Sequence, residues 1–103
     1  MKKILITGSN GFIGRNLKEY LAEDFIVLAP NHEELDLLDD AAVLNFLKKN
    51  TVDQVIHCAT HNDTRNSAKD LSKVFYSNLR MFFNLARCNH LYNRMRAFPN
   101  SKK

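Results

Sequence analysis

The sequence predicts an α/β protein in which helices cover both faces of a parallel β-sheet, giving three layers. Two observations carry this prediction. Short, largely apolar runs alternate along the chain with segments of helical periodicity, which is the pattern of buried strands joined by helical crossovers. In addition, the three glycines of the chain all lie within seven residues, between the first apolar run and the first helical segment. At 103 residues the chain has the length of one small domain.

The first part of the chain predicts a strand, a helix and two further strands. Residues 4–6 are wholly apolar and indicate a buried strand. A helix is expected from about Gly11 to Ala22, because apolar residues recur there at helical spacing. Residues 25–29 indicate a second buried strand, and residues 34–36 a brief third one.

The middle of the chain predicts another helix and strand. Residues 41–49 place apolar side chains on one helical face, and either Asp39 or Asp40 can cap the start of this helix. Residues 52–58 indicate the fourth strand.

The last part of the chain predicts a loop, a long helix and a tail. Residues 60–68 are polar, as in a loop, and residues 71–88 indicate a long helix with little polar surface. Residues 93–103 show no usable periodicity and are expected to form an irregular, unanchored tail. The predicted domain therefore covers residues 1–92.

Composition excludes several classes of function. The net charge of +4 is small and the basic residues are scattered, so nucleic-acid binding is not expected. Cys58 and Cys88 form no Cys-x-x-Cys pair, so we expect reduced thiols and a cytoplasmic protein. His57 and His61 have no third ligand nearby, so no metal site is expected. No apolar run approaches the ~18 residues of a membrane span.

The three glycines predict a binding site for a dinucleotide. Gly8 permits a tight turn off the first strand, Gly11 lets the backbone approach a pyrophosphate, and Gly14 lets the helix pack closely on the strand. The free N–H groups at the start of the helix then face the anion. The alternative is a plain strand–helix turn, which needs only one glycine.

The sequence Thr7-Gly8-Ser9-Asn10-Gly11-Phe12-Ile13-Gly14 resembles the signature of the extended short-chain dehydrogenase/reductases, the family of nucleotide-sugar epimerases, dehydratases and reductases. Three further segments are similar to motifs of this family, in the right order: residues 35–39, residues 57–60, and Asn78 with the later Asn84-Leu85. The resemblance implies a Rossmann-type three-layer sheet, truncated after the fourth strand and fourth helix. Residues 34–39 look most like the branch of GDP-fucose synthase and dTDP-4-dehydrorhamnose reductase.

The resemblance also implies which residues hold the cofactor. Asp36 would contact the adenine, and residues 57–60 would line the pyrophosphate and the nicotinamide ribose. The full expected set is Gly8, Ser9, Asn10, Gly11, Phe12, Ile13, Gly14, Arg15, Asn31, His32, Asp36, Leu37, Cys58, Ala59, Thr60 and Asn78.

The cofactor is expected to be NAD(P), with a slight preference for NADP. NAD enzymes usually place an acid at the end of the second strand, and residues 29–32 contain none. Arg15 and His32 could meet a 2′-phosphate; the alternative is that both are ordinary surface residues.

No catalytic residue is expected in this chain. The family uses a Tyr-x-x-x-Lys pair, whereas Tyr20, Tyr76 and Tyr92 are followed four residues later by Asp24, Arg80 and Arg96. The sequence therefore predicts the NAD(P)-binding part of a nucleotide-sugar enzyme, truncated and inactive by itself; the alternative is a non-catalytic module that senses the redox state or binds partners. The implied partners are a dinucleotide and, for the full-length parent, a nucleotide sugar. An unpaired fourth strand and an uncovered long helix would favour a homo-oligomer.

Overall fold

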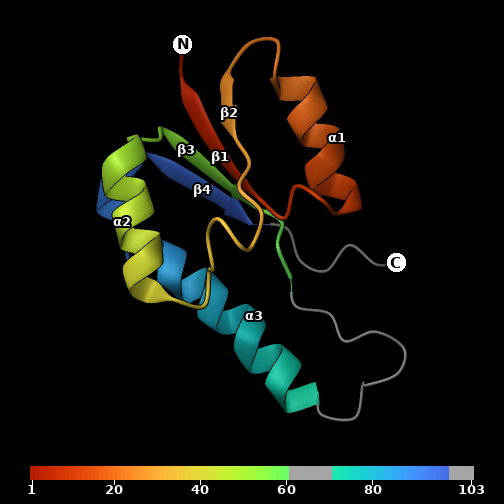
Figure 1. Ribbon diagram of the computed structural model, residues 1–103, viewed down its shortest axis with the longest axis vertical. Helices are drawn as coiled ribbons and strands as arrows, with labels where there is room; N and C mark the ends of the chain where they lie inside the picture. Colours follow the sequence, from red (N-terminus) through yellow and green to blue (C-terminus); the bar gives the residue numbers. More distant parts are fainter. Residues whose placement is uncertain (61–70, 98–103) are drawn as a thin grey trace.

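A computed structural model of the chain describes residues 1–60 and 71–97 and shows one parallel sheet flanked by helices (Figure 1). The sheet order is β2-β1-β3-β4, with every neighbouring pair parallel. The strands are β1 (Lys3–Thr7), β2 (Ile26–Leu28), β3 (Gln54–His57) and β4 (Arg94–Ala97). The helices are α1 (Phe12–Leu21), α2 (Asp40–Asn50) and α3 (Leu71–Ala86), followed by a 3-10 turn at Asn89–Leu91.

The sheet lies between two helical layers, as the sequence predicts. Helix α1 lies on one face, and α2 and α3 lie together on the other (Figure 1). Strand β1 has a strand on each side and helices over both faces of the sheet, so its side chains Ile4, Leu5 and Ile6 are almost fully buried. Leu5 and Val55 of the sheet join the helical core around Leu47 and Leu85. No helix in the described part of the chain is long and apolar enough to cross a membrane.

The start of α2 settles which aspartate is its cap. Asp39 stands at the N-cap, and its carboxylate accepts hydrogen bonds from the N–H groups of Ala41 and Ala42 at 3.1 and 3.2 Å. These bonds satisfy two of the amides that a helix start leaves without partners. Lys48 and Lys49 lie in the last turn, where positive charge complements the helix dipole.

The expected third strand at residues 34–36 is wrong: this segment forms turns. Asn31 Oδ1 accepts from the N–H groups of Glu33 and Glu34, and Glu34 Oε1 accepts from the N–H of Asn31. Such local side-chain bonds compete with a β-ladder for the main chain. Leu35 and Leu37 of this region nevertheless point into the core.

The expected irregular tail from residue 93 is wrong where the structure describes it. Residues 94–97 form β4, which pairs with β3, so the fourth expected strand is not left unpaired. Asn93 donates its N–H to Asp53 O, and Met95 packs against the core. This strand is not predicted because the exposed Arg94 and Arg96 interrupt the segment, so the sequence has no continuous apolar run there. Residues 98–103, and most of the expected loop at 60–68, lie outside the described residues.

Candidate functional site

The turn between β1 and α1 requires two of its glycines for packing. Gly8 has φ +75°, a conformation that side chains disfavour, and a Cβ on it would lie 2.5 Å from Ala59 N. A Cβ on Gly14 would overlap the carbonyl oxygen of Gly8 and lie 2.9 Å from Ser9 Cα. Gly14 therefore allows α1 to start close against the turn itself.

Gly11 differs from the other two glycines because no packing contact requires it. A Cβ there would have only Gly8 O within contact range, at 3.6 Å, and its φ of −81° suits any residue. Gly11 is the N-cap of α1 and has no side chain to cap the helix, so the N–H groups of Phe12, Ile13 and Gly14 have no acceptor among the described residues. This arrangement fits an anion held by main-chain N–H groups.

A cavity of about 570 Å³ opens beside this turn, at the carboxyl edge of the sheet. Four segments line it: the turn after β1, the segment after β2, the segment after β3, and one residue of α3. The lining residues are Thr7, Gly8, Ser9, Asn10, Gly11, Pro30, Asn31, His32, Leu35, Asp36, Leu37, Leu38, Cys58, Ala59, Thr60 and Met81. Open α/β sheets bind their ligands at this edge, and the volume suits a small molecule.

Most residues expected from the sequence to bind the cofactor meet in this cavity. Those that line it are Gly8, Ser9, Asn10, Gly11, Asn31, His32, Asp36, Leu37, Cys58, Ala59 and Thr60. Five expected residues do not line it. Phe12, Ile13 and Gly14 form the first turn of α1, and only their main-chain N–H groups could contact a ligand in the cavity. Arg15 is exposed on α1, and Asn78 lies half-buried on α3.

Five lining residues were not expected: Thr7, Pro30, Leu35, Leu38 and Met81. Thr7, Pro30, Leu35 and Leu38 adjoin expected residues in the sequence, so the same segments could have indicated them. Met81 carries no such signal, because only the folding of α3 against the sheet brings it to the cavity.

Thr7 and His57 join the ends of β1 and β3 beneath the cavity. Thr7 Oγ1 lies 2.7 Å from His57 Nδ1 and accepts from the N–H groups of Cys58 and Ala59 at 3.1 and 3.2 Å. Because both acceptor positions of the hydroxyl are used, its proton must point to Nδ1, which leaves the histidine proton on Nε2. Burial without a counter-charge lowers the pKa of His57 to about 4, so the ring is neutral near pH 7.

Two polar side chains of the lining are already committed to the turns that they form. Asn31 Oδ1 accepts two main-chain N–H groups, and Asp36 Oδ1 accepts the N–H of Leu38 at 3.0 Å. His32 is an exposed lining residue, and no hydrogen bond occupies it within the described part of the chain. His32 is therefore the side chain of this segment best placed to meet an added ligand group.

The cysteines and histidines suggest no further chemistry. Burial raises the pKa of the Cys58 thiol, and burial is also the main reason that the pKa of Cys88 is raised. Neither thiol is therefore activated as a nucleophile. Across residues 1–60 and 71–97, no group of three or more His, Cys, Asp or Glu side chains could hold a metal ion.

The sequence profile of the NAD dependent epimerase/dehydratase family matches residues 4–98. Among curated proteins, the chain is 32% identical over 89 residues to GDP-L-colitose synthase from Yersinia pseudotuberculosis, a match that covers 81% of this chain. It is also 39% identical over 59 residues to GDP-L-fucose synthase from Azorhizobium caulinodans, covering 56% of this chain. The chain spans only 28% and 19% of the lengths of these two relatives.

Solved structures share the fold. A GDP-mannoheptose C4 reductase from Campylobacter jejuni with NADP bound superposes with a TM-score of 0.83 at 26% identity, covering 94% of this chain and 30% of the reductase. A dTDP-4-dehydrorhamnose reductase from Bacillus anthracis in complex with NADP gives a TM-score of 0.77 at 26% identity, covering 88% and 33%. Both the expected family and the expected three-layer fold are confirmed.

Proposed function

The chain belongs to the NAD dependent epimerase/dehydratase family, and we propose that it is the NAD(P)-binding part of a nucleotide-sugar epimerase, dehydratase or reductase, inactive by itself. One observation carries the proposal. No packing contact requires a glycine at position 11, yet its lack of a side chain exposes the main chain at the start of α1. This main chain lies next to a cavity at the carboxyl edge of the sheet. A diphosphate is the ligand that such a turn suits best.

The cavity lining suggests how the two halves of the dinucleotide would lie. The diphosphate would sit on Gly11 and the N–H groups of the first turn of α1. The adenine would lie against Asp36, Leu37 and Met81, which supply apolar surface and main-chain polar groups. The nicotinamide ribose would reach the segment of Cys58, Ala59 and Thr60 after β3. The bound dinucleotide would supply hydride transfer in the whole enzyme.

We further propose that NADP is preferred over NAD. His32 is exposed at the rim that follows β2, where the extra 2′-phosphate of NADP would lie. The two reductases described above were solved with NADP. Arg15 does not line the cavity, so His32 is the better candidate for contact with this phosphate.

The inactivity of this chain is supported by where its tyrosines lie. Tyr20 is exposed on α1, Tyr76 accepts a hydrogen bond from Arg80 on the surface of α3, and Tyr92 is buried and donates to Leu85 O at 2.7 Å. None of the three lines the cavity. A proton donor for the hydride-transfer step would have to come from outside these residues.

Calorimetric titration of the 103-residue chain with NADPH and NADH tests these proposals. We expect saturable binding of both, tighter for NADPH, and no consumption of either when GDP- or dTDP-linked keto sugars are added. Absence of binding to both would overturn the proposed site. Turnover would overturn the inactivity. In a further titration with NADP⁺, an affinity very different from that for NADPH, without turnover, would favour the alternative function of a redox-sensing module.

We also propose that the chain forms homo-oligomers through α3. Phe75, Leu79 and Phe83 recur every four residues along this helix, and Tyr76 lies beside them; all four are exposed, Phe75 at 68% and Phe83 at 52%. Helix α3 packs against α2 along only part of its length, and its N-terminal end extends beyond the sheet (Figure 1). An exposed aromatic stripe of this kind marks a protein contact.

A further inference from the structure

Helix α3 buries one amide side chain in an otherwise apolar stripe. Met81 and Leu85 lie on its inner face and belong to the core, as does Cys88 just beyond its C-terminal end. Asn84 lies among them and is only 2% exposed. A buried amide costs free energy unless its polar atoms have partners, so this position calls for a specific contact.

The contact is with the segment proposed to hold the adenine. Asn84 Nδ2 donates a 2.8 Å hydrogen bond to the carbonyl oxygen of Leu37, 47 residues earlier in the chain. Leu37 itself lines the dinucleotide cavity, together with its neighbours Asp36 and Leu38. The turn that presents these residues to the ligand is therefore held from behind by an amide that does not reach the cavity.

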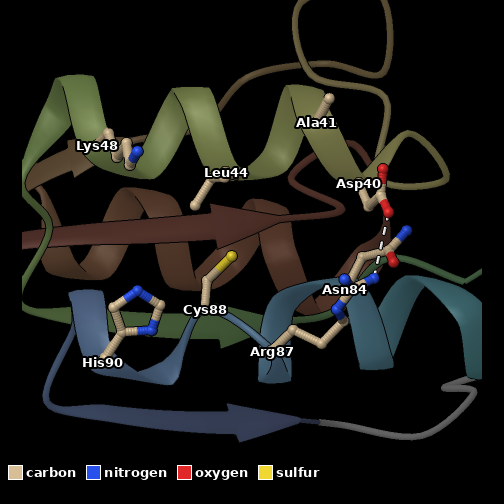
Figure 2. Close-up of a pocket in the computed structure, with 8 residues that line it drawn as sticks. All are labelled: Asp40, Ala41, Leu44, Lys48, Asn84, Arg87, Cys88 and His90. Atoms are coloured by element: carbon tan, nitrogen blue, oxygen red, sulfur yellow. Dashed lines mark hydrogen bonds and ion pairs between the residues drawn. The ribbon is translucent and has the colours of Figure 1, made fainter.

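A second hollow lies on the far side of this bond. It is a groove of about 480 Å³ between α2 and α3, and Figure 2 shows Asn84 at one end of it, beside the ion pair of Asp40 and Arg87. Asn84 lines this groove and Leu37 lines the dinucleotide cavity. The side chain of Leu37 packs in the core, so removal of the amide would act on the main chain around its carbonyl and not on the packing of the side chain.

From this geometry we propose that Asn84 is a positioning residue for adenine recognition, acting through the main chain of Leu37. The inference rests on the proposed dinucleotide site and assigns to it a determinant outside the cavity. Without the amide donor, the carbonyl of Leu37 loses its partner and the turn shifts toward another donor. The adenine surface is then displaced, whereas the diphosphate site at Gly11, on the other side of the cavity, keeps its shape.

The experiment compares two single variants that each remove one buried hydrogen bond to a main-chain carbonyl. Asn84→Leu removes the bond to Leu37, and Tyr92→Phe removes the bond from Tyr92 to Leu85 O, away from the cavity. Each folded variant is titrated by NMR with ADP-ribose, which contains the adenine, and with nicotinamide mononucleotide, which does not. Thermal unfolding without ligand measures the stability of each variant.

We expect Asn84→Leu to weaken ADP-ribose binding about tenfold, a change in binding free energy comparable to the contribution of one hydrogen bond. Binding of nicotinamide mononucleotide should stay unchanged. Tyr92→Phe should lower the unfolding temperature and change neither affinity. If Asn84→Leu does not fold, Asn84→Ser, which is too short to reach Leu37, should show the same selective loss.

Three outcomes would count against the inference. If the unsubstituted chain and the folded Asn84 variants bind ADP-ribose with equal affinity, the inference is overturned and the proposed dinucleotide site stands. Equal weakening of both ligands would reduce Asn84 to a general stabilising residue. A parent chain that binds neither ADP-ribose nor NADPH would overturn the proposed function and this inference together.

Discussion

Thr7 Oγ1 lies 2.7 Å from Nδ1 of His57, and this bond ties the last residue of β1 to the last residue of β3. The same oxygen accepts from the N–H groups of Cys58 and Ala59. A Cβ on Gly8 would collide with this same segment of Ala59, so the two strand ends are held in close contact. The Thr7 hydroxyl therefore adds to the main-chain pairing of β1 and β3 in holding together two walls of the proposed dinucleotide cavity.

Replacement of Thr7 by valine tests this role because it keeps the shape of the side chain and removes the hydroxyl. The N–H of Ala59 and the buried Nδ1 of His57 would each lose a partner, whereas the N–H of Cys58 keeps the carbonyl oxygen of Thr7, so we expect a loss of roughly 2–3 kcal/mol in unfolding free energy. NADPH binding should weaken as the two walls separate. Thr7→Ser, which retains the oxygen, should preserve both properties in urea unfolding and in calorimetry. Equal behaviour of the two variants would contradict the assignment.

The stability of the chain should fall with acid because of His57. Its pKa is about 4 in the folded chain and about 6.5 when the side chain is free, so the unfolded state binds the proton more readily. The stabilisation from the neutral His57 is therefore complete above pH 6.5. It is lost as the pH falls toward 4, and the total loss is roughly 3 kcal/mol of unfolding free energy. Urea midpoints measured from pH 7.5 to 4 check this.

The control for the acid effect is His57→Asn. Its amide oxygen can still accept from the Thr7 hydroxyl but does not titrate in this range. This variant retains His32, His61 and His90. We expect its unfolding free energy to depend less steeply on pH between 6.5 and 4. A slope as steep as that of the parent would place the titrating group elsewhere.

Gly11 and Gly14 should respond differently to replacement by alanine. Gly11→Ala should change the unfolding free energy by no more than about 0.5 kcal/mol, because its backbone and surroundings accept a Cβ. It should nevertheless weaken NADPH binding by about tenfold or more, since the new methyl group would lie where the diphosphate is proposed to approach.

Gly14→Ala serves as the contrasting variant. The added Cβ would overlap the carbonyl oxygen of Gly8, so we expect a loss of more than about 3 kcal/mol in stability. Thermal unfolding and NADPH titration of both variants separate the two roles. A Gly11→Ala chain that binds NADPH as tightly as the parent would argue that the diphosphate lies elsewhere.

The proposed contact through α3 predicts an oligomer that charge can disrupt. The double variant Phe75→Glu and Phe83→Glu places two carboxylates on the exposed stripe, so we expect light scattering to show a shift from dimer or larger to monomer. Tyr20→Glu is the matched control, because Tyr20 is an exposed aromatic residue on α1, away from this stripe. A parent that is already monomeric at high concentration would contradict the proposal.

The sequence alone indicated the strands and helices whose signals are local. The buried run at residues 4–6, an aspartate cap of α2 at Asp39 or Asp40 and the glycine turn before α1 are all properties of neighbouring residues. Each is confirmed, and the structure selects Asp39 as the cap. The same local signals identified most of the cavity lining, because motifs that follow parallel strands all meet at one edge of the sheet.

The tertiary structure alone decided the contacts between residues far apart in the chain. It converted the expected third strand into turns held by Asn31 and Asn84, and it formed β4 from a segment that carries two arginines. It also brought Met81 to the cavity and paired Thr7 with His57. Local spacing determines which face of an element is apolar, whereas the partner of a buried polar atom depends on how the elements pack, and no spacing in the sequence records that packing.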